Sequence, residues 1–227
     1  GVPIDTIKVI HRGADTERFN PKNVSAERVI ALATNWRLPD GKSVIMLPGR
    51  LTRWKGQTVF IDAIAKLKRE DIIALIVGSD QGRTDYRNEL ERMVSDRGLG
   101  EIVRFINHCN DMPAAYKLTD VVVSASIAPE AFGRVVVEAQ AVGRPVVATK
   151  HGGSTETVLD GETGWLVPPK DPSALANMIE NALNISSNER TLLAERAIKH
   201  IQDNFSKSRM CEQTLEVYDK VLSQISG

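Results

Sequence analysis

The chain has 227 residues, of which 42% are hydrophobic and 26% are charged, and its formal net charge is zero. This composition suits a globular domain with a sizeable apolar core, and it excludes a disordered, collagenous or coiled-coil chain. The balanced charge argues against nucleic acid as a partner, because any anionic ligand would have to be held by local cations.

Short runs rich in β-branched residues alternate with amphipathic stretches along most of the chain. The runs, in chain order, cover residues 8–10, 44–47, 72–77, 102–106, 121–124, 145–148 and 164–167. Each run predicts a strand. Several runs are apolar throughout, which is typical of strands covered on both faces in a parallel sheet. Between them, apolar residues recur at helical spacing, as at Phe60, Ile64 and Leu67.

After Pro172 the pattern changes to helices without further strands. Leu175, Ile179 and Ala182 mark one amphipathic helix, and the helical tail over about 172–227 ends in a predicted helix around Thr214–Leu222. Neither a repeat nor a linker divides the chain. The alternation therefore predicts one α/β domain over residues 1–227, with a doubly wound parallel sheet of the Rossmann-like type.

Polar loops after the predicted strands are the places to seek a site, because open α/β sheets bind ligands beyond the carboxyl ends of their strands. The first such loop, residues 48–56, carries Arg50, Arg53 and Lys55 beside Gly49 and matches neither a Walker loop nor a G-x-G-x-x-G motif. It suits an anion. The alternative is a set of solvated surface cations.

The second loop, residues 125–134, leads into a predicted helix whose N–H groups and dipole could hold a diphosphate. The peptide groups in question belong to Phe132, Gly133, Arg134 and Val135. Glu130 lies just outside this helix and Glu138 about five residues inside it, so the two could contact different parts of one extended ligand. The alternative is that Glu130 is only a favourable charge near the helix N-terminus and that Glu138 is a solvated side chain.

The third loop, residues 149–156, places paired glycines before a short helix. By itself this loop is only weak evidence for a ligand site. We expect His151, like His108, to be an exposed loop histidine, because no nucleophile with an acidic partner can be placed beside it.

Taken together, these loops resemble the signature of the group 1, or family 4, retaining glycosyltransferases. That signature is Glu, seven residues, then Glu, in the context Pro-Glu-x-Phe-Gly and followed by Glu-Ala-x-Ala-x-Gly-x-Pro-Val-Val-Ala-Thr; this chain carries it at 129–133 and 138–149. Further family marks occur in order at 49–51, 55–56, 152–153, 156, 160–161, 164 and 169–171. The resemblance covers nearly the whole chain.

The resemblance implies one half of a two-domain GT-B architecture, namely the donor-binding half, with the N-terminal acceptor domain absent. It implies that Arg50 and Lys55 hold the donor diphosphate, that Glu138 holds the ribose hydroxyls and that Glu130 contacts the transferred sugar. The backbone around Cys109 would meet the nucleotide base. The implied catalytic residues are Glu130, Arg50 and Lys55, and the implied donor-binding set is Gly49, Arg50, Lys55, Cys109, Glu130, Phe132, Gly133, Arg134, Val135 and Glu138.

Two departures from the family pattern stand out. Arg134 occupies a position often filled by an aliphatic residue, and Arg12-Gly13-Ala14-Asp15 replaces the commoner Asn-Gly-Val-Asp. The chain has no Asp-x-Asp motif, which fits metal-independent binding of a UDP-, GDP- or ADP-sugar without a cofactor.

The resemblance therefore implies a retaining hexosyltransferase that moves sugar to a glycan, lipid or small molecule, with this domain inactive by itself. A same-fold epimerase or phosphorylase, and a non-catalytic nucleotide-sugar-binding module, are the alternatives. Cys109 and Cys211 do not suggest a disulfide framework, and no apolar run approaches the roughly 20 residues of a membrane span. We expect a soluble cytoplasmic protein; contact with the inner face of the membrane through the absent domain is a further expectation.

Overall fold

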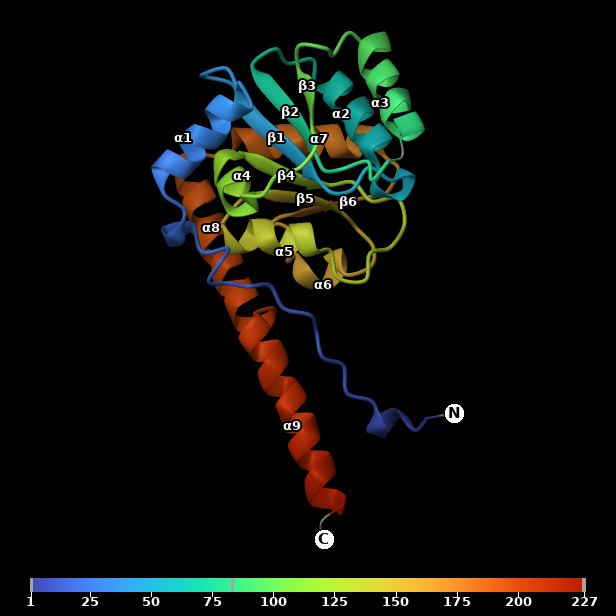
Figure 1. The fold of residues 1–227 in the computed structure, drawn as a ribbon, viewed down its shortest axis with the longest axis vertical. Coiled ribbons are helices and arrows are strands. Elements are labelled where there is room, and N and C mark those ends of the chain that lie inside the picture. Colours follow the sequence, from blue (N-terminus) through green and yellow to red (C-terminus); the bar gives the residue numbers. More distant parts are fainter. Residues whose placement is uncertain (1, 83, 226–227) are drawn as a thin grey trace.

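A computed structural model describes residues 2–82 and 84–225 of the chain. Its centre is one sheet of six parallel strands in the order β3-β2-β1-β4-β5-β6 (Figure 1). The strands are β1 (Ser43–Pro48), β2 (Ile72–Val77), β3 (Val103–Ile106), β4 (Val121–Ser124), β5 (Val146–Thr149) and β6 (Trp165–Val167). The sheet grows outward in both directions from the adjacent pair β1 and β4, so the predicted doubly wound fold is confirmed.

Helices connect the strands and continue after the last one. They are α1 (Ala26–Asn35), α2 (Gln57–Leu67), α3 (Thr84–Asp96), α4 (Met112–Leu118), α5 (Arg134–Ala141), α6 (Ser154–Thr157), α7 (Pro172–Asn184), α8 (Ser187–Asn204) and α9 (Lys207–Ile225). No strand follows Pro172 in the part of the chain that the structure describes, as the sequence predicts. The predicted domain range also includes residues 1, 83, 226 and 227, which lie outside the described residues.

Two hydrophobic layers sandwich the sheet, because successive side chains of a strand point to opposite faces. Ile45 and Leu47 of β1 pack into a layer built with α2, α3 and α7. Val44 and Met46 of the same strand pack into the opposite layer, which includes side chains of α4, α5 and α8. Burial on both faces explains why the central strands read as continuous apolar runs.

The predicted strand at 8–10 is wrong. Residues 7–13 have no regular secondary structure, and Ile7 and Val9 are 54% and 70% exposed. The segment runs away from the domain body (Figure 1). A β-branched run becomes a strand only when a neighbouring strand satisfies its backbone, and no sheet edge lies beside this one.

The two ends of the domain meet at Ala14. Its N–H donates to Phe205 O over 2.8 Å, and the Lys207 N–H donates to Ala14 O over 2.8 Å. A Cβ atom at Gly13 would lie 2.4 Å from the Ser206 carbonyl, so only glycine permits this crossing. The contact fixes the segment before α1 against the start of α9.

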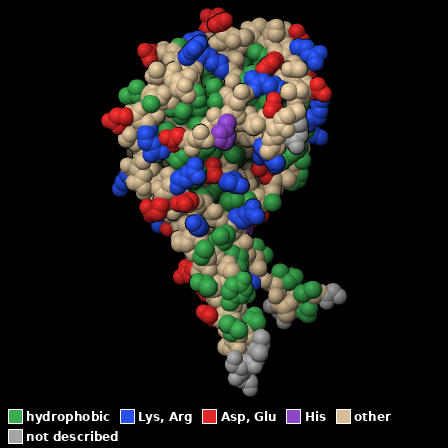
Figure 2. All heavy atoms as spheres, in the orientation of Figure 1, with side chains coloured by type: hydrophobic (Ala, Val, Ile, Leu, Met, Phe, Trp, Pro, Cys, Tyr) green, Lys and Arg blue, Asp and Glu red, His purple; other side chains and the backbone are tan. Residues whose placement is uncertain are grey.

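Beyond this crossing, α9 and the first residues project from the body (Figure 1). Figure 2 shows hydrophobic side chains along both projections. Leu215 and Tyr218 on α9 are 59% and 60% exposed, and Val2 and Ile4 are 73% and 83% exposed. None of the described helices is long and apolar enough to cross a bilayer.

Candidate functional site

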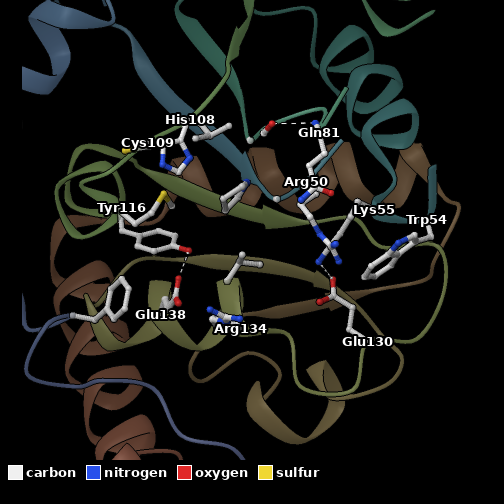
Figure 3. A pocket seen from close by; sticks show the side chains of 18 of the residues that line it. Arg50, Trp54, Lys55, Gln81, His108, Cys109, Tyr116, Glu130, Arg134 and Glu138 are labelled. Atoms are coloured by element: carbon white, nitrogen blue, oxygen red, sulfur yellow. Dashed lines mark hydrogen bonds and ion pairs between the residues drawn. The ribbon is translucent and has the colours of Figure 1, made fainter. Parts of the chain in front are cut away.

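A pocket of about 600 Å³ lies at the carboxyl end of the sheet, above the junction between β1 and β4. Loops after four strands supply its wall: Arg50 follows β1, Ser79 follows β2, Cys109 follows β3 and Glu130 follows β4. This is the switch point of the sheet, where neighbouring connections leave in opposite directions and open a crevice. Figure 3 shows the pocket from close by.

Lys55 and Glu130 form an ion pair at one end of the pocket. The Lys55 ammonium donates to Glu130 Oε1 over 2.6 Å, and each side chain is only 12% exposed. The Ser126 hydroxyl donates to the same carboxylate oxygen, and the Lys55 ammonium lies 4.5 Å from the Trp54 ring centroid. The pair therefore joins the loop after β1 to the loop after β4, which are distant in sequence.

Gly56 makes this pairing possible. Its φ is 71°, in the left-handed region, and a Cβ atom there would lie 1.9 Å from Ala125 O. A side chain would force the two loops apart, because it would meet backbone that cannot move aside. The Lys55-Gly56 pair of the sequence signature thus has a structural reason.

Arg50 reaches into the same end of the pocket (Figure 3). It is exposed, and among the described residues no hydrogen bond or ion pair engages its guanidinium. Nearby, the N-terminus of α5 supplies further positive potential, because its first helical bond runs from the Val136 N–H to Gly133 O and leaves the preceding peptide groups outside the helix ladder. These groups can together hold a phosphate chain.

Glu138 lies at the other end of the pocket in different surroundings. The Tyr116 hydroxyl donates to Glu138 Oε2 over 2.9 Å, and the Tyr116 side chain is fully buried. Burial raises the pKa of Glu138, against the lowering effects of the Tyr116 hydrogen bond and of the Arg134 and Arg18 charges. Glu138 is thus half-buried and hydrogen-bonded, so the alternative of a solvated side chain is wrong.

Most of the predicted donor-binding residues line this one pocket. They are Gly49, Arg50, Lys55, Cys109, Glu130, Arg134, Val135 and Glu138. Phe132 and Gly133 instead line an adjoining cavity of about 850 Å³. His108 lines the pocket and bonds to Asn110 over 2.8 Å, whereas His151 bonds to Ser126 O over 2.7 Å and supports the loop that carries Glu130.

The sequence did not single out Tyr116, Ser126 or Trp54, although all three contact the predicted site residues. Tyr116 lies in an apolar helix, where its ring is indistinguishable from core packing. Only its buried hydroxyl, which needs a partner, could have drawn attention to it. Among the described residues, no three His, Cys, Asp or Glu side chains gather to hold a metal ion.

Comparisons with known proteins identify the family of the chain. A family model described as "Glycosyl transferases group 1" matches residues 31–200. A D-inositol 3-phosphate glycosyltransferase from Corynebacterium urealyticum is 35% identical over an alignment of 219 residues, and the alignment covers 93% of this chain and 50% of that protein. The chain thus spans about half the length of the curated relatives it matches.

Solved structures share the whole fold. A glycosyltransferase from Rickettsia africae ESF-5 has a TM-score of 0.95 at 32% identity, covering 97% of this chain and 59% of that one. Anabaena Alr3699/HepE, in complex with UDP and glucose, has a TM-score of 0.88 at 31% identity and the same two coverages, 97% and 59%.

Proposed function

The chain belongs to the group 1 glycosyltransferase family, and on this premise we propose that it is the donor-binding half of a retaining glycosyltransferase. The donor is a nucleotide sugar that lies along the pocket with its ribose at Glu138 and its diphosphate at Arg50 and Lys55. Anabaena Alr3699/HepE was solved with UDP and glucose, which makes UDP the first nucleotide to test.

One observation carries the proposal: the two glutamates of the signature lie in one pocket with different partners. Glu130 meets a cation and Glu138 meets a neutral hydroxyl. A carboxylate held by a neutral donor suits sugar hydroxyls, whereas one held beside Lys55 suits the region where charge moves between sugar and phosphate. An extended ligand with both features is a nucleotide sugar.

The proposed transfer replaces one bond with another at the anomeric carbon. The bond from that carbon to the β-phosphate oxygen breaks, and its electron pair stays on the departing diphosphate. The acceptor hydroxyl forms the new bond on the same face, and its proton passes to the departing phosphate oxygen. Arg50, Lys55 and the N-terminus of α5 stabilise the negative charge that develops on the leaving group.

Binding is tested on this chain by thermal shift with UDP, GDP and ADP, because a ligand that binds only the folded state raises apparent stability. We expect one of them to stabilise the chain and no sugar transfer to follow. No shift with any of the three would contradict donor binding. Transfer at the rate of the two-domain protein would contradict the need for an acceptor domain.

Slow hydrolysis of the donor by the two-domain protein separates an enzyme from a non-catalytic binding module. Turnover supports the transferase. Binding without turnover, over a full panel of UDP-, GDP- and ADP-sugars, supports the module and contradicts the proposed activity.

We infer that the partner domain covers the exposed apolar side of α9. Leu215, Tyr218 and Val221 recur at helical spacing, and they are 59%, 60% and 47% exposed. We expect fast amide hydrogen exchange in α9 of this chain and slower exchange in the two-domain protein. Equal protection in both would contradict this interface.

A further inference from the structure

Two departures from the family pattern, separated by more than a hundred residues, meet in one place. Arg12 and Arg134 both line the cavity of about 850 Å³ that adjoins the donor pocket. Arg134 also lines the donor pocket itself, and Figure 3 shows it between Glu130 and Glu138. Neither arginine is accounted for by the proposed donor contacts, which need only the Arg134 backbone.

The crossing at Ala14 places Arg12 and adds a third cation. Gly13 and Ala14 pack against the chain from Phe205 to Lys207, so Arg12 and Lys207 come to the same cavity wall. The neighbouring His11 ring lies 5.5 Å from the Phe205 ring. Arg12 is therefore carried by an anchored segment, although the residues before it project from the body.

Arg18 completes the group of cations. Its guanidinium lies 5.5 Å from the Phe19 ring centroid, and its side chain lines both cavities. Within residues 2–82 and 84–225, no ion pair or side-chain hydrogen bond engages Arg12, Arg18, Arg134 or Lys207.

The carboxylates in the same wall already have partners. Asp15 accepts the Arg18 backbone N–H over 3.0 Å, Glu130 pairs with Lys55, and Glu138 accepts the Tyr116 hydroxyl. The adjoining cavity is lined by five cationic side chains (Arg12, Arg18, Arg50, Arg134 and Lys207) and three carboxylates (Asp15, Glu130 and Glu138), and Glu130 is already paired with Lys55, so the lining carries a net positive charge. The excess cations repel one another, which a bound anion relieves.

We propose that this adjoining cavity binds an oxyanion, a phosphate or carboxylate, carried by the sugar acceptor. Arg12 and Lys207 line this cavity and not the donor pocket, so an anion that they hold lies outside the proposed donor contacts, and we assign it to the acceptor. The planar guanidinium groups suit such groups because they donate two parallel hydrogen bonds to one oxyanion. The inference rests on the proposed function and adds the chemical class of the acceptor.

The test uses this chain with its donor pocket saturated by UDP, so that Arg50 and Lys55 are occupied. Glucose 6-phosphate, gluconate and uncharged glucose are then titrated by calorimetry. We expect the two anions to bind at least about tenfold more tightly than glucose, the scale of one charged hydrogen bond. Arg12→Gln and Lys207→Gln should each remove most of that difference. Arg92→Gln is the matched control, since Arg92 is an exposed arginine of α3 that lines neither cavity.

Equal affinity for glucose and glucose 6-phosphate would overturn the proposal, as would wild-type affinity for glucose 6-phosphate in Arg12→Gln. A preference for UDP-glucuronate over UDP-glucose that disappears in Arg12→Gln would assign the oxyanion to the donor sugar and also overturn it. Failure of UDP itself to bind would contradict the proposed function at an earlier step, so the two failures are distinguishable.

Discussion

The two ends of the donor pocket hold the same kind of side chain in contrasting surroundings. At one end Glu130 is clamped by the Lys55 ammonium and the Ser126 hydroxyl. At the other end Glu138 is half-buried beside a neutral tyrosine, and this partial burial raises its pKa. Both residues are glutamates of one signature, so their different partners decide what each carboxylate can do. A charge-paired carboxylate positions groups where charge develops, and a half-buried one with a neutral donor selects hydroxyls.

The largest effect is expected from Glu130→Gln in the two-domain protein. If Glu130 orients the transferred sugar as its bond to phosphate breaks, kcat should fall roughly 10- to 1,000-fold with little change in KM. The measurement is steady-state transfer at saturating acceptor, or donor hydrolysis where no acceptor is known. A change in KM alone would assign Glu130 to binding, and a folding check is needed because a helix-terminal charge contributes up to about 1 kcal/mol.

Lys55→Met should come next, with a Kd for UDP raised roughly 10- to 100-fold, because a hydrogen bond to a charged group contributes about 1.5–3 kcal/mol. Uridine has no phosphate, so its affinity should change little. The double variant Lys55→Met with Glu130→Gln removes both charges of the pair. If the double variant recovers UDP binding, the single variant acted by leaving Glu130 without its partner, and Lys55 does not hold the diphosphate.

Glu138→Gln should raise the Kd for UDP by about tenfold with a smaller change in kcat, because two ribose hydroxyls are already bound in the ground state. The variant should also lose discrimination between UDP and its 2′,3′-dideoxy analogue. If turnover is abolished at saturating donor, Glu138 does not act in binding alone, and its role does not differ from that of Glu130 as proposed.

The raised pKa of Glu138 gives this end of the pocket a pH signature. The ionised carboxylate accepts the ribose hydroxyls, so UDP affinity should be full above the raised pKa and fall as pH drops through it. The contribution of Glu138 to the stability of the free chain has the opposite pH dependence. It is fully present below the ordinary carboxyl pKa and is lost as the pH rises through the raised pKa. Glu138→Gln should therefore be at least as stable as the wild type at neutral pH, and its UDP affinity should lack this pH step.

The smallest effect is expected from Tyr116→Phe, which removes one hydroxyl and keeps the buried ring. The Kd for UDP should rise about threefold, the weaker end of a neutral hydrogen bond. Because that bond lowers the pKa of Glu138, the pH at which UDP affinity is lost should move upward. An unchanged pH profile with reduced thermal stability would make Tyr116 a packing residue only.

Sequence reasoning placed the sheet well because the central strands are nearly continuous apolar runs. Residues 72–77 and 121–124 match β2 and β4 to the residue. It failed at 8–10, where the β-branched residues have the right propensity but no neighbouring strand. Propensity is local, whereas a strand is defined by a partner that only the folded chain supplies.

The site divides in the same way. The sequence determined the loops after the strands, the spacing of Glu130 and Glu138, and the cations at Arg50 and Lys55, because these follow from local pattern and a signature of contiguous residues. The tertiary structure decided the pairing of Lys55 with Glu130, the hydrogen bond of Tyr116 to the half-buried Glu138 and the placement of Arg12 and Arg134 on one cavity wall. Each of these arrangements joins separate segments of the chain, and their geometry depends on the order of the strands and on close approaches at Gly13 and Gly56, which no local pattern specifies.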